Sequence, residues 1–540
     1  MHHFVRRAAA LVAAPALVTL AFVAAPPTAS AVPAPLPAPA AAAAGWLALQ
    51  APDYGSFAIG NTIDQELALD ALGGHESTVQ AIGAGVADHL TAYTDYAYCD
   101  VTYGTPPCPE GEHAIAGTSA GAVAKALVGL QAAGTDSSGV VTRLEGLVRN
   151  AGDDLAGRAI SPETTDGAPS ANGYTNVIGQ SFAVRGLASA GSAEAAVASD
   201  YLWRLQCENG SFQEGLPGEE VAQTCDATTF SSTSVDATAL AVIALAQVGG
   251  EDADAAVIKA TTWLKSVQQS SGGFTSDGAA GTPNANSTGV ATQALGSTGS
   301  AQAAAKGAIW VRQHQINVQS GCAPFRASAS GAIGYDDVDR AAALKDGITT
   351  GSYAKWLRAT AQAAPALKWA PEGGTPKVLF TAEYVRGGTT QTVGVTGVDP
   401  GEQLCARLGT QRVIRWATAG GAASLAVKIP TTTATSSVAV SGVEKKIGTA
   451  LIHGLGATKV PFTVKAKVRT GRYQSVRVSG LAPAESVTVR VLGKVKRGQA
   501  TSKGTFNARV KATGKPRKVT VTVTGEFSNR TNRKTFKVVR

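Results

Sequence analysis

The sequence lacks the patterns that membrane spans, zinc sites and large aromatic cavities require. After residue 31 no stretch reaches 18 consecutive apolar residues, so no transmembrane segment is predicted in the mature chain. The seven His are scattered and do not cluster with the six Cys, so we expect neither zinc nor another metal. Aromatic residues make up only 6% of the chain, which argues against an aromatic-lined cavity. We also predict no cofactor.

Acidic residues are almost absent from the C-terminal end. Residues 459–540 contain 21 Lys+Arg and only 2 Asp+Glu, a net charge of +19, whereas residues 32–373 contain 16 Lys+Arg and 33 Asp+Glu. Such a positive charge should attract polyanions over roughly 8 Å at physiological salt. The side chains expected to bind the polyanion are Lys494, Lys496, Arg497, Lys515, Arg517 and Lys518. Docking of the basic unit on the acidic half is the alternative.

The N-terminus has the pattern of a secretory signal peptide. Arg6 and Arg7 precede the apolar stretch Ala8–Ala25, and residues 29–31 form a small-residue cleavage site. We therefore predict residues 1–31 as a signal peptide, with a membrane anchor as the alternative, and residues 32–44 as a Pro/Ala-rich linker. The mature protein is then secreted or located at the cell surface.

The six cysteines favour disulfides in an exported protein. We predict the local pairs Cys99–Cys108 and Cys207–Cys225, because each pair is close in sequence and lies in a polar stretch. Cys322 and Cys405 remain, either as a pair across a domain boundary or with one thiol free.

A long repeat runs through residues 45–365. Ala/Leu-rich segments end in Leu followed by Gly, and an amphipathic segment such as residues 255–269 precedes them, so each repeat is predicted to be a helical hairpin. The marker leucines are Leu72, Leu130, Leu187, Leu245, Leu295 and Leu344. No polar capping repeat is visible, so we predict that six hairpins close into a ring with their second helices inside. Residues 352–362 would close it against a first helix at Gly45–Gln50.

A Gly/Ser-Gly/Ser-Phe element recurs at residues 55–57, 210–212 and 272–274, with a degenerate copy that ends at Phe325. We expect Gly272 and Gly273 to end a helix at its C-cap, and Phe274 to cover the helix end. These elements resemble the repeats of prenyltransferases and squalene–hopene cyclases. The resemblance identifies residues 45–365 as a member of the α/α-toroid superfamily, which also contains complement thioester domains and the cobalamin carriers.

Asp236 is the sharpest catalytic candidate. In the segment Ser234–Ala239, Asp236, Thr238 and Ala239 match the DxDDTA box of the squalene–hopene cyclases, in which an Asp protonates an alkene, but Ser234 and Ala237 replace its flanking carboxylates. We expect Asp236 to cap an inner helix instead, as Asp64 would in its own repeat. The inner helices offer mostly Ala, Leu and Val, so the interior is predicted to be apolar and poor in proton donors.

The connections between helices differ in length, and the long ones alternate with the short ones. In a ring, all the long loops emerge at one end, which we call the long-loop rim, and insertions gathered on one face are typical of a binding side. The residues that we assign to ligand binding are Phe57, Phe212, Phe274, Tyr174 and Asp236.

Beyond residue 371 the sequence alternates Val and Thr in the manner of strands. Residues 392–404 match residues 475–487, which predicts two tandem β-sandwiches, residues 374–458 and 459–540, that resemble bacterial immunoglobulin-like modules. The predicted fold is thus an (α/α)6 toroid followed by two immunoglobulin-like β-sandwiches.

The combined patterns favour a secreted, envelope-associated and non-catalytic binding protein. Its long-loop rim would bind an unknown ligand or protein, and its basic unit would contact an anionic envelope polymer or lipid head groups, with nucleic acid disfavoured by the scarcity of stacking aromatics. The alternatives are a terpenoid-cyclase-like or glycan-acting enzyme, such as a polysaccharide lyase, and a small-molecule carrier of the cobalamin type.

Overall fold

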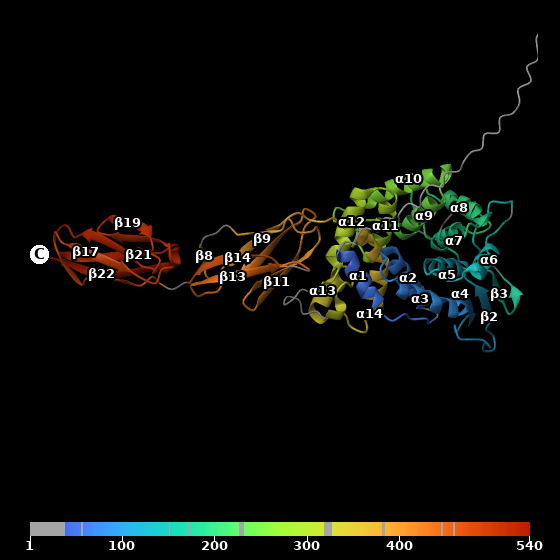
Figure 1. Cartoon of the computed structure of the whole chain (residues 1–540), viewed down its shortest axis with the longest axis horizontal. Coiled ribbons are helices and arrows are strands. Elements are labelled where there is room, and N and C mark those ends of the chain that lie inside the picture. Colours follow the sequence, from blue (N-terminus) through green and yellow to red (C-terminus); the bar gives the residue numbers. More distant parts are fainter. Residues whose placement is uncertain are drawn as a thin grey trace, which may run out of the picture. The chain divides into compact units, whose positions relative to one another are not determined.

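The computed structural model describes residues 38–540, apart from residues 56–57, 151, 171–172, 226–231, 318–326, 381–383, 444–445 and 457–458. The predicted signal peptide, Phe57, Phe325 and Cys322 therefore lie outside the described residues. A helical region is followed by a β-rich region (Figure 1). Among the helices that the structure describes, none combines the length and the apolar character that crossing a bilayer requires.

Six helices of the helical region form a closed cycle of contacts. We call them the inner helices: α2 (Ile59–Leu72), α5 (Ala120–Ala132), α7 (Val177–Ser189), α9 (Val235–Val248), α11 (Ala285–Ser297) and α14 (Tyr353–Ala363). Each packs on the next in this order, and α14 packs on α2, so the series returns to its start. The outer helices are α1 (Ala38–Ala48), α3 (Glu76–Asp88), α6 (Ser138–Glu145), α8 (Glu194–Arg204), α10 (Glu251–Val267) and α12 (Ala301–His314). The other helical elements that the structure describes in this region are α4 (Leu90–Thr94), α13 (Asp337–Asp346), η2 (Ala327–Ala329) and η3 (Ala364–Trp369), and η4 (Ser528–Arg530) lies in the β-rich region.

Two details of the predicted hairpins are wrong. The sixth inner helix is α14 and not α13, which contains the marker Leu344, because α13 is rich in charged residues and buries only Ala343. Helix α1 begins at Ala38, inside the predicted linker, since its alanine-rich sequence favours a helix and half of its side chains are buried. The predicted contact between the last and the first helix is confirmed, because the Tyr353 hydroxyl donates to Gln50 Oε1 at 2.9 Å.

A glycine in the loop after four outer helices packs against the outer helix of the next hairpin. These glycines have positive φ, and a Cβ on any of them would come within 2.0–2.6 Å of a backbone oxygen, so no other residue fits without a shift. The pairs are Gly157 with Val197, Gly210 with Lys259, Gly272 with Lys306, and Gly331 with Ala42. The last pair joins the final long loop to α1. Gly272 is thus a packing glycine and not the predicted C-cap, because α10 ends at Val267 with Gln268 as its cap.

The second residue after each of these glycines donates its backbone N–H to a side chain of an inner helix at 2.9 Å. The pairs are Ala159 with Gln180, Phe212 with Thr238, Phe274 with Thr288, and Ile333 with Thr360. The last copy of the element is therefore residues 331–333 and not the predicted copy ending at Phe325. Its aromatic residue is replaced by Ile333, which explains why the sequence pattern missed it.

The long loops meet one another at the N-terminal ends of the inner helices, as the predicted rim requires. Strands from two of these loops form one sheet, composed of β1 (Asp95–Cys99), β2 (Ala114–Thr118), β3 (Glu163–Thr165) and β4 (Ala168–Pro169). A third loop pairs β5 (Phe212–Gln213) with β6 (Thr233–Ser234). The predicted disulfides Cys99–Cys108 and Cys207–Cys225 are confirmed, and both lie in these loops. Cys405 is also disulfide-bonded.

The β-rich region contains two units, and each has a five-stranded and a three-stranded sheet around its own apolar core. The first β unit contains β7 (Lys377–Leu379), β8 (Tyr384–Arg386), β9 (Thr390–Thr396), β10 (Gln403–Leu408), β11 (Gln411–Trp416), β12 (Ala422–Lys428), β13 (Ala434–Ser441) and β14 (Lys446–Leu455). The second β unit contains β15 (Phe462–Thr463), β16 (Lys467–Arg469), β17 (Tyr473–Val478), β18 (Ser486–Val491), β19 (Lys494–Gln499), β20 (Phe506–Lys511), β21 (Arg517–Thr524) and β22 (Thr531–Val539).

The two β units repeat one topology. The five-stranded sheets have the orders β11-β10-β13-β14-β8 and β19-β18-β21-β22-β16, which correspond strand by strand. In both, a short strand pairs in parallel with the last strand of the unit. The sequence match between residues 392–404 and 475–487 therefore reflects a duplicated fold.

Candidate functional site

Two of the phenylalanines that we assigned to ligand binding, Phe212 and Phe274, are packing residues. Phe212 and Phe274 are both 0% exposed, and each backbone N–H is bound to a threonine of an inner helix. A dissolved ligand does not reach such rings, which belong to the apolar core of the helical region. Phe57 lies outside the described residues.

The inner helices carry a charged network, which contradicts the prediction of an apolar interior. Asp64 on α2 binds Lys125 on α5 at 2.6 Å and accepts from Gln362 Nε2 on α14 at 3.0 Å. Both charged side chains are less than one fifth exposed, so their pairing compensates for lost hydration. On the same side, Arg358 Nε donates to Asn61 Oδ1 at 3.0 Å. Single polar residues separated by many apolar ones gave no sequence signal, because contacts between different repeats bring them together.

The ring of Phe182 on α7 adds an aromatic surface to this network. Lys125 Nζ lies 5.7 Å from the ring centroid, and Arg185 Cζ lies 5.5 Å from it. A cation over an aromatic face gains about 0.5–2 kcal/mol, depending on how far it is desolvated. The inner surface therefore combines a carboxylate, two cations and an aromatic ring, a set that suits polar or anionic ligands better than terpenoid chains.

Asp236 does not cap α9, in contrast to our prediction. The cap is Ser234, whose side chain accepts from Ala237 N at 3.1 Å. Asp236 instead bonds Ser287 on the neighbouring α11, and its Oδ1 is buried without a partner. Burial raises the pKa of Asp236 to about 6, against the lowering by Ser287, and the negative charge of Glu214 raises it further. Asp64 is likewise a mid-helix ion-pair residue and not a cap.

The Asp236→Asn substitution should stabilise the protein at neutral pH. The folded-state pKa of about 6 lies above the ordinary 3.8, so the stability that the neutral carboxyl contributes is lost as the pH rises between these values. One pKa unit corresponds to about 1.36 kcal/mol. Allowing for partial solvent access, the substitution should raise the free energy of unfolding at pH 7 by about 1–3 kcal/mol. Chemical unfolding at pH 4 and pH 7 measures it. A loss at pH 7 would reinstate the capping role.

Tyr174 borders a cavity at the long-loop rim. The cavity has a volume of about 390 Å³ and opens between the N-terminal ends of α5 and α7, with Tyr93, Lys125 and Phe182 in its wall. Tyr174 is 73% exposed and stands at its edge. Of the four described residues that we assigned to ligand binding, Tyr174 borders this cavity, and Phe212, Phe274 and Asp236 do not.

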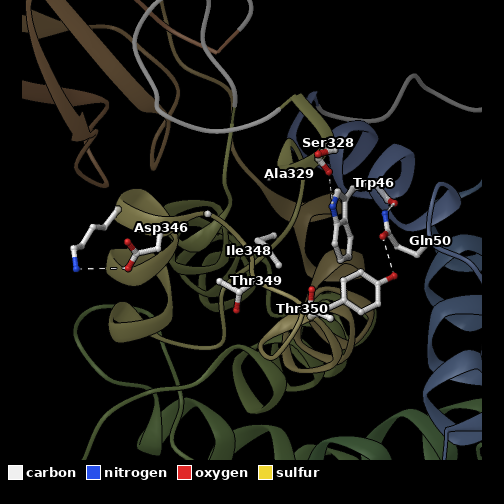
Figure 2. A pocket seen from close by; sticks show the side chains of 11 residues that line it. Trp46, Gln50, Ser328, Ala329, Asp346, Ile348, Thr349 and Thr350 are labelled. Carbon is white, nitrogen blue, oxygen red and sulfur yellow. Dashed lines mark hydrogen bonds and ion pairs between the residues drawn. The ribbon is translucent and has the colours of Figure 1, made fainter.

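A second cavity lies where the last inner helix meets the first outer helix. It has a volume of about 560 Å³. Figure 2 shows Trp46 of α1 and Gln50, just after α1, on one side of this cavity, and Asp346 and Thr349 on the other. Trp46 Nε1 donates to Ser328 O at 3.1 Å, and Gln50 accepts from Tyr353. These polar groups join the two ends of the helical region, so we regard the cavity as part of that contact.

Five of the six residues that we predicted to bind a polyanion fall into two groups. Lys494 and Lys496 lie on β19, an edge strand, opposite the buried Val491 and Val489, and charges on the inward side of an edge strand protect it from pairing with another chain. Three others, Lys515, Arg517 and Lys518, are exposed at the start of β21. All six predicted polyanion-binding residues are exposed.

Within the described ranges, no three His, Cys, Asp or Glu side chains gather closely enough to hold a metal ion.

No family model matches the sequence, and no curated protein matches it. Solved structures give partial likenesses: the Yersinia pseudotuberculosis adhesin InvE (15% identity, 30% of this chain and 58% of that chain, TM-score 0.16), a Ca²⁺-stabilised ice-binding adhesin of an Antarctic bacterium (15%, 32% and 49%, 0.18), and SGBP-B of a Bacteroides ovatus glucan utilisation locus in complex with a heptasaccharide (14%, 30% and 45%, 0.14). This chain thus spans about half the length of these proteins, and at such scores the likenesses assign no family.

Proposed function

We propose that the chain is a secreted, envelope-associated binding protein whose second β unit contacts an anionic polymer of the cell envelope. The helical region is proposed to be an α/α toroid that presents its long-loop rim to a ligand, and both β units are proposed to be immunoglobulin-like. Binding to lipid head groups would use the same charge, and the experiment below separates it from polymer binding.

The observation that carries the proposal is the uncompensated positive charge of the second β unit. Its two acidic residues lie away from the exposed sheet faces: Glu485 is buried and paired with Arg530, and Glu526 accepts from the backbone of Ser486. None of the strands β15–β22 contains an Asp or Glu. The remaining cations therefore have no internal counter-charge, and anions in solution are their available partners.

Three observations support a closed toroid. The contacts of the inner helices return to α2, the glycine contacts return to α1 through Gly331, and the long loops share sheets and backbone bonds at one end. The cavity beside Tyr174 opens at that end. Its combination of Lys125, aromatic rings and helix N-termini suits a small polar ligand with negative charge, which makes it the proposed ligand mouth of the toroid.

Salt-dependent retention on envelope material tests the polymer proposal. The full-length chain is incubated with isolated cell-envelope polymer and with vesicles of phosphatidylglycerol and phosphatidylcholine, from 50 to 500 mM NaCl. We expect binding to the polymer that falls at least tenfold over this range, because each cation that contacts an anion releases a counterion on binding. Retention that does not change with salt concentration, or binding that occurs only with the vesicles, would refute binding to an anionic polymer.

A further inference from the structure

The outer face of the five-stranded sheet in the second β unit carries three lysines side by side. Lys467 on β16 pairs with Lys537 on β22, and Lys537 pairs with Lys518 on β21. All three side chains are exposed. Neighbouring strands lie about 4.8 Å apart, and like charges directly opposite each other destabilise a sheet. The lysine row therefore lowers the stability of the unbound protein, and a bound anion would reduce the repulsion between the lysines.

Protection of the sheet edge does not explain this row. Strand β16 is an edge strand, but β21 and β22 lie inside the sheet, and their backbone groups are already paired on both sides. The fold does not require the lysines either. In the first β unit the equivalent row is Tyr384, His453 and Thr435, in which Thr435 Oγ1 and His453 Nδ1 share a hydrogen bond of 2.8 Å.

Threonines separate this lysine row from a second set of cations. Going along β22, Lys537 is followed on the same face by Thr535 and then Arg533, so the two charges lie about 13 Å apart. Thr535 is opposite Thr520 on β21, which continues the hydroxyl row between the charges. The outer face thus alternates cation, hydroxyl and cation along the strand. The other cations and threonines on this face are Arg469, Arg490, Arg497, Thr488, Thr522, Thr524 and Thr531.

The opposite, three-stranded sheet is also basic, but its cations are placed differently. Arg477 faces Asn507, Arg509 faces Ser475, and Lys511 faces Tyr473, so each charge has a neutral partner. Arg509 also lies 5.0 Å from the centroid of the Tyr473 ring. This face shows no like-charge row, and it provides a matched control within the same unit.

We propose that the outer face of the five-stranded sheet, centred on Lys467, Lys537 and Lys518, binds a linear polyanion whose charged groups are separated by hydroxyl-bearing sugar or polyol units. This inference rests on the proposed function and assigns its binding surface. The lysines bind the anionic groups, and the threonines hydrogen-bond the hydroxyls between them. Nucleic acid fits poorly, because this face offers no exposed aromatic ring for base stacking.

The test compares two triple variants of the full-length chain that remove the same charge. One is Lys467→Gln, Lys518→Gln and Lys537→Gln, and the other is Arg477→Gln, Arg509→Gln and Lys511→Gln. The probes are hyaluronate and poly(glycerol phosphate), which supply the anion as carboxylate or as phosphodiester, with single-stranded DNA of equal charge and phosphatidylglycerol vesicles for comparison. We expect the lysine triple to lose at least tenfold in affinity for one or both polymers, and the control triple to lose less than threefold.

The lysine triple should also lower the slope of log affinity against log salt by about 2, since about 0.7 counterions are released per contact on a flexible polyanion. Its unfolding temperature should rise, because the repulsion is removed. Equal losses in both triples would overturn this surface while leaving the proposed function intact, as would tighter binding of DNA or vesicles than of the polymers. Wild-type protein that binds neither polymer nor envelope material at 50 mM salt would overturn both.

Discussion

The Glu66→Gln substitution should make the helical region more stable at neutral and alkaline pH, by about 3 kcal/mol at pH 7 and about 5 kcal/mol at pH 8. Glu66 lies on α2 with 0% exposure, and neither carboxylate oxygen has a hydrogen-bond partner. Its oxygens lie against Gly83 and Gly129, because a Cβ on these glycines would come within 2.8 and 2.7 Å of them. No cation is among the groups that shift the pKa of Glu66, so the ionised carboxylate has no compensation for its lost hydration.

The sign of the effect follows from the pKa. Burial first, and then the charge of Asp70, raises the pKa of Glu66 from 4.5 to about 8. Between these values the folded state holds a proton that the unfolded state releases, so the free energy of unfolding falls by about 1.36 kcal/mol per pH unit. The contribution of neutral Glu66 is complete below pH 4.5 and lost by pH 8. Glutamine does not ionise and removes this slope.

Tryptophan fluorescence reports on this transition, because six of the seven tryptophans lie before residue 370. Urea unfolding of wild type and variant from pH 5 to pH 9 gives the difference in stability at each pH. The control is Glu76→Gln on α3, where the carboxylate is exposed and its pKa is lowered by backbone hydrogen bonds at Glu76 and Gly74. Parallel curves for wild type and Glu66→Gln would show that the carboxylate is solvated or paired when folded.

Much of the fold could be predicted because each sequence repeat corresponds to one structural unit. The Leu-Gly markers located five of the six inner helices, and the match of residues 392–404 with 475–487 located the two β units. The sixth inner helix was misassigned because Leu344 copies the marker, whereas burial in α14 depends on Trp356 and its neighbours, which follow no marker. A sequence pattern identifies a helix locally. The contacts of α14 with α2 and α11 make it, and not α13, the sixth inner helix.

The candidate sites were harder to predict, for a physical reason. Asp64 and Lys125 belong to successive repeats, whereas Gln362 belongs to the last inner helix, and only the contact of α14 with α2 brings Gln362 to Asp64. The lysine row has the same origin, because Lys467, Lys518 and Lys537 become neighbours through strand order and register. Composition revealed that the second β unit is basic. It did not distinguish the edge-protecting Lys494 and Lys496 from the face that the lysine row forms.

The Arg530→Met substitution should destabilise the second β unit by about 3–5 kcal/mol, the cost of breaking a buried ion pair on one side. Arg530 is 1% exposed and Glu485 is 0% exposed. Arg530 donates from Nε to Glu485 Oε1 at 2.7 Å and from Nη2 to Oε2 at 3.1 Å, and it also binds Gly480 O and Gly456 O at 3.0 and 3.2 Å. Methionine fills similar space but leaves the Glu485 carboxylate buried without a counter-charge.

The double variant Arg530→Met, Glu485→Leu separates the loss of charge pairing from the loss of packing. If the penalty comes from the orphaned carboxylate, removal of Glu485 should recover most of the stability, because two apolar side chains can replace a buried pair at little cost. Backbone hydrogen exchange of β18, β21 and β22 measures the second β unit separately from the rest of the chain. Arg533→Met is the matched control, since Arg533 is exposed on the neighbouring strand. A double variant as unstable as Arg530→Met would instead assign the penalty to backbone groups. These are the carbonyls of Gly456 and Gly480, which lose their donor in both variants, and the N–H groups of Ala482 and Glu526, which lose Glu485 as their acceptor in the double variant.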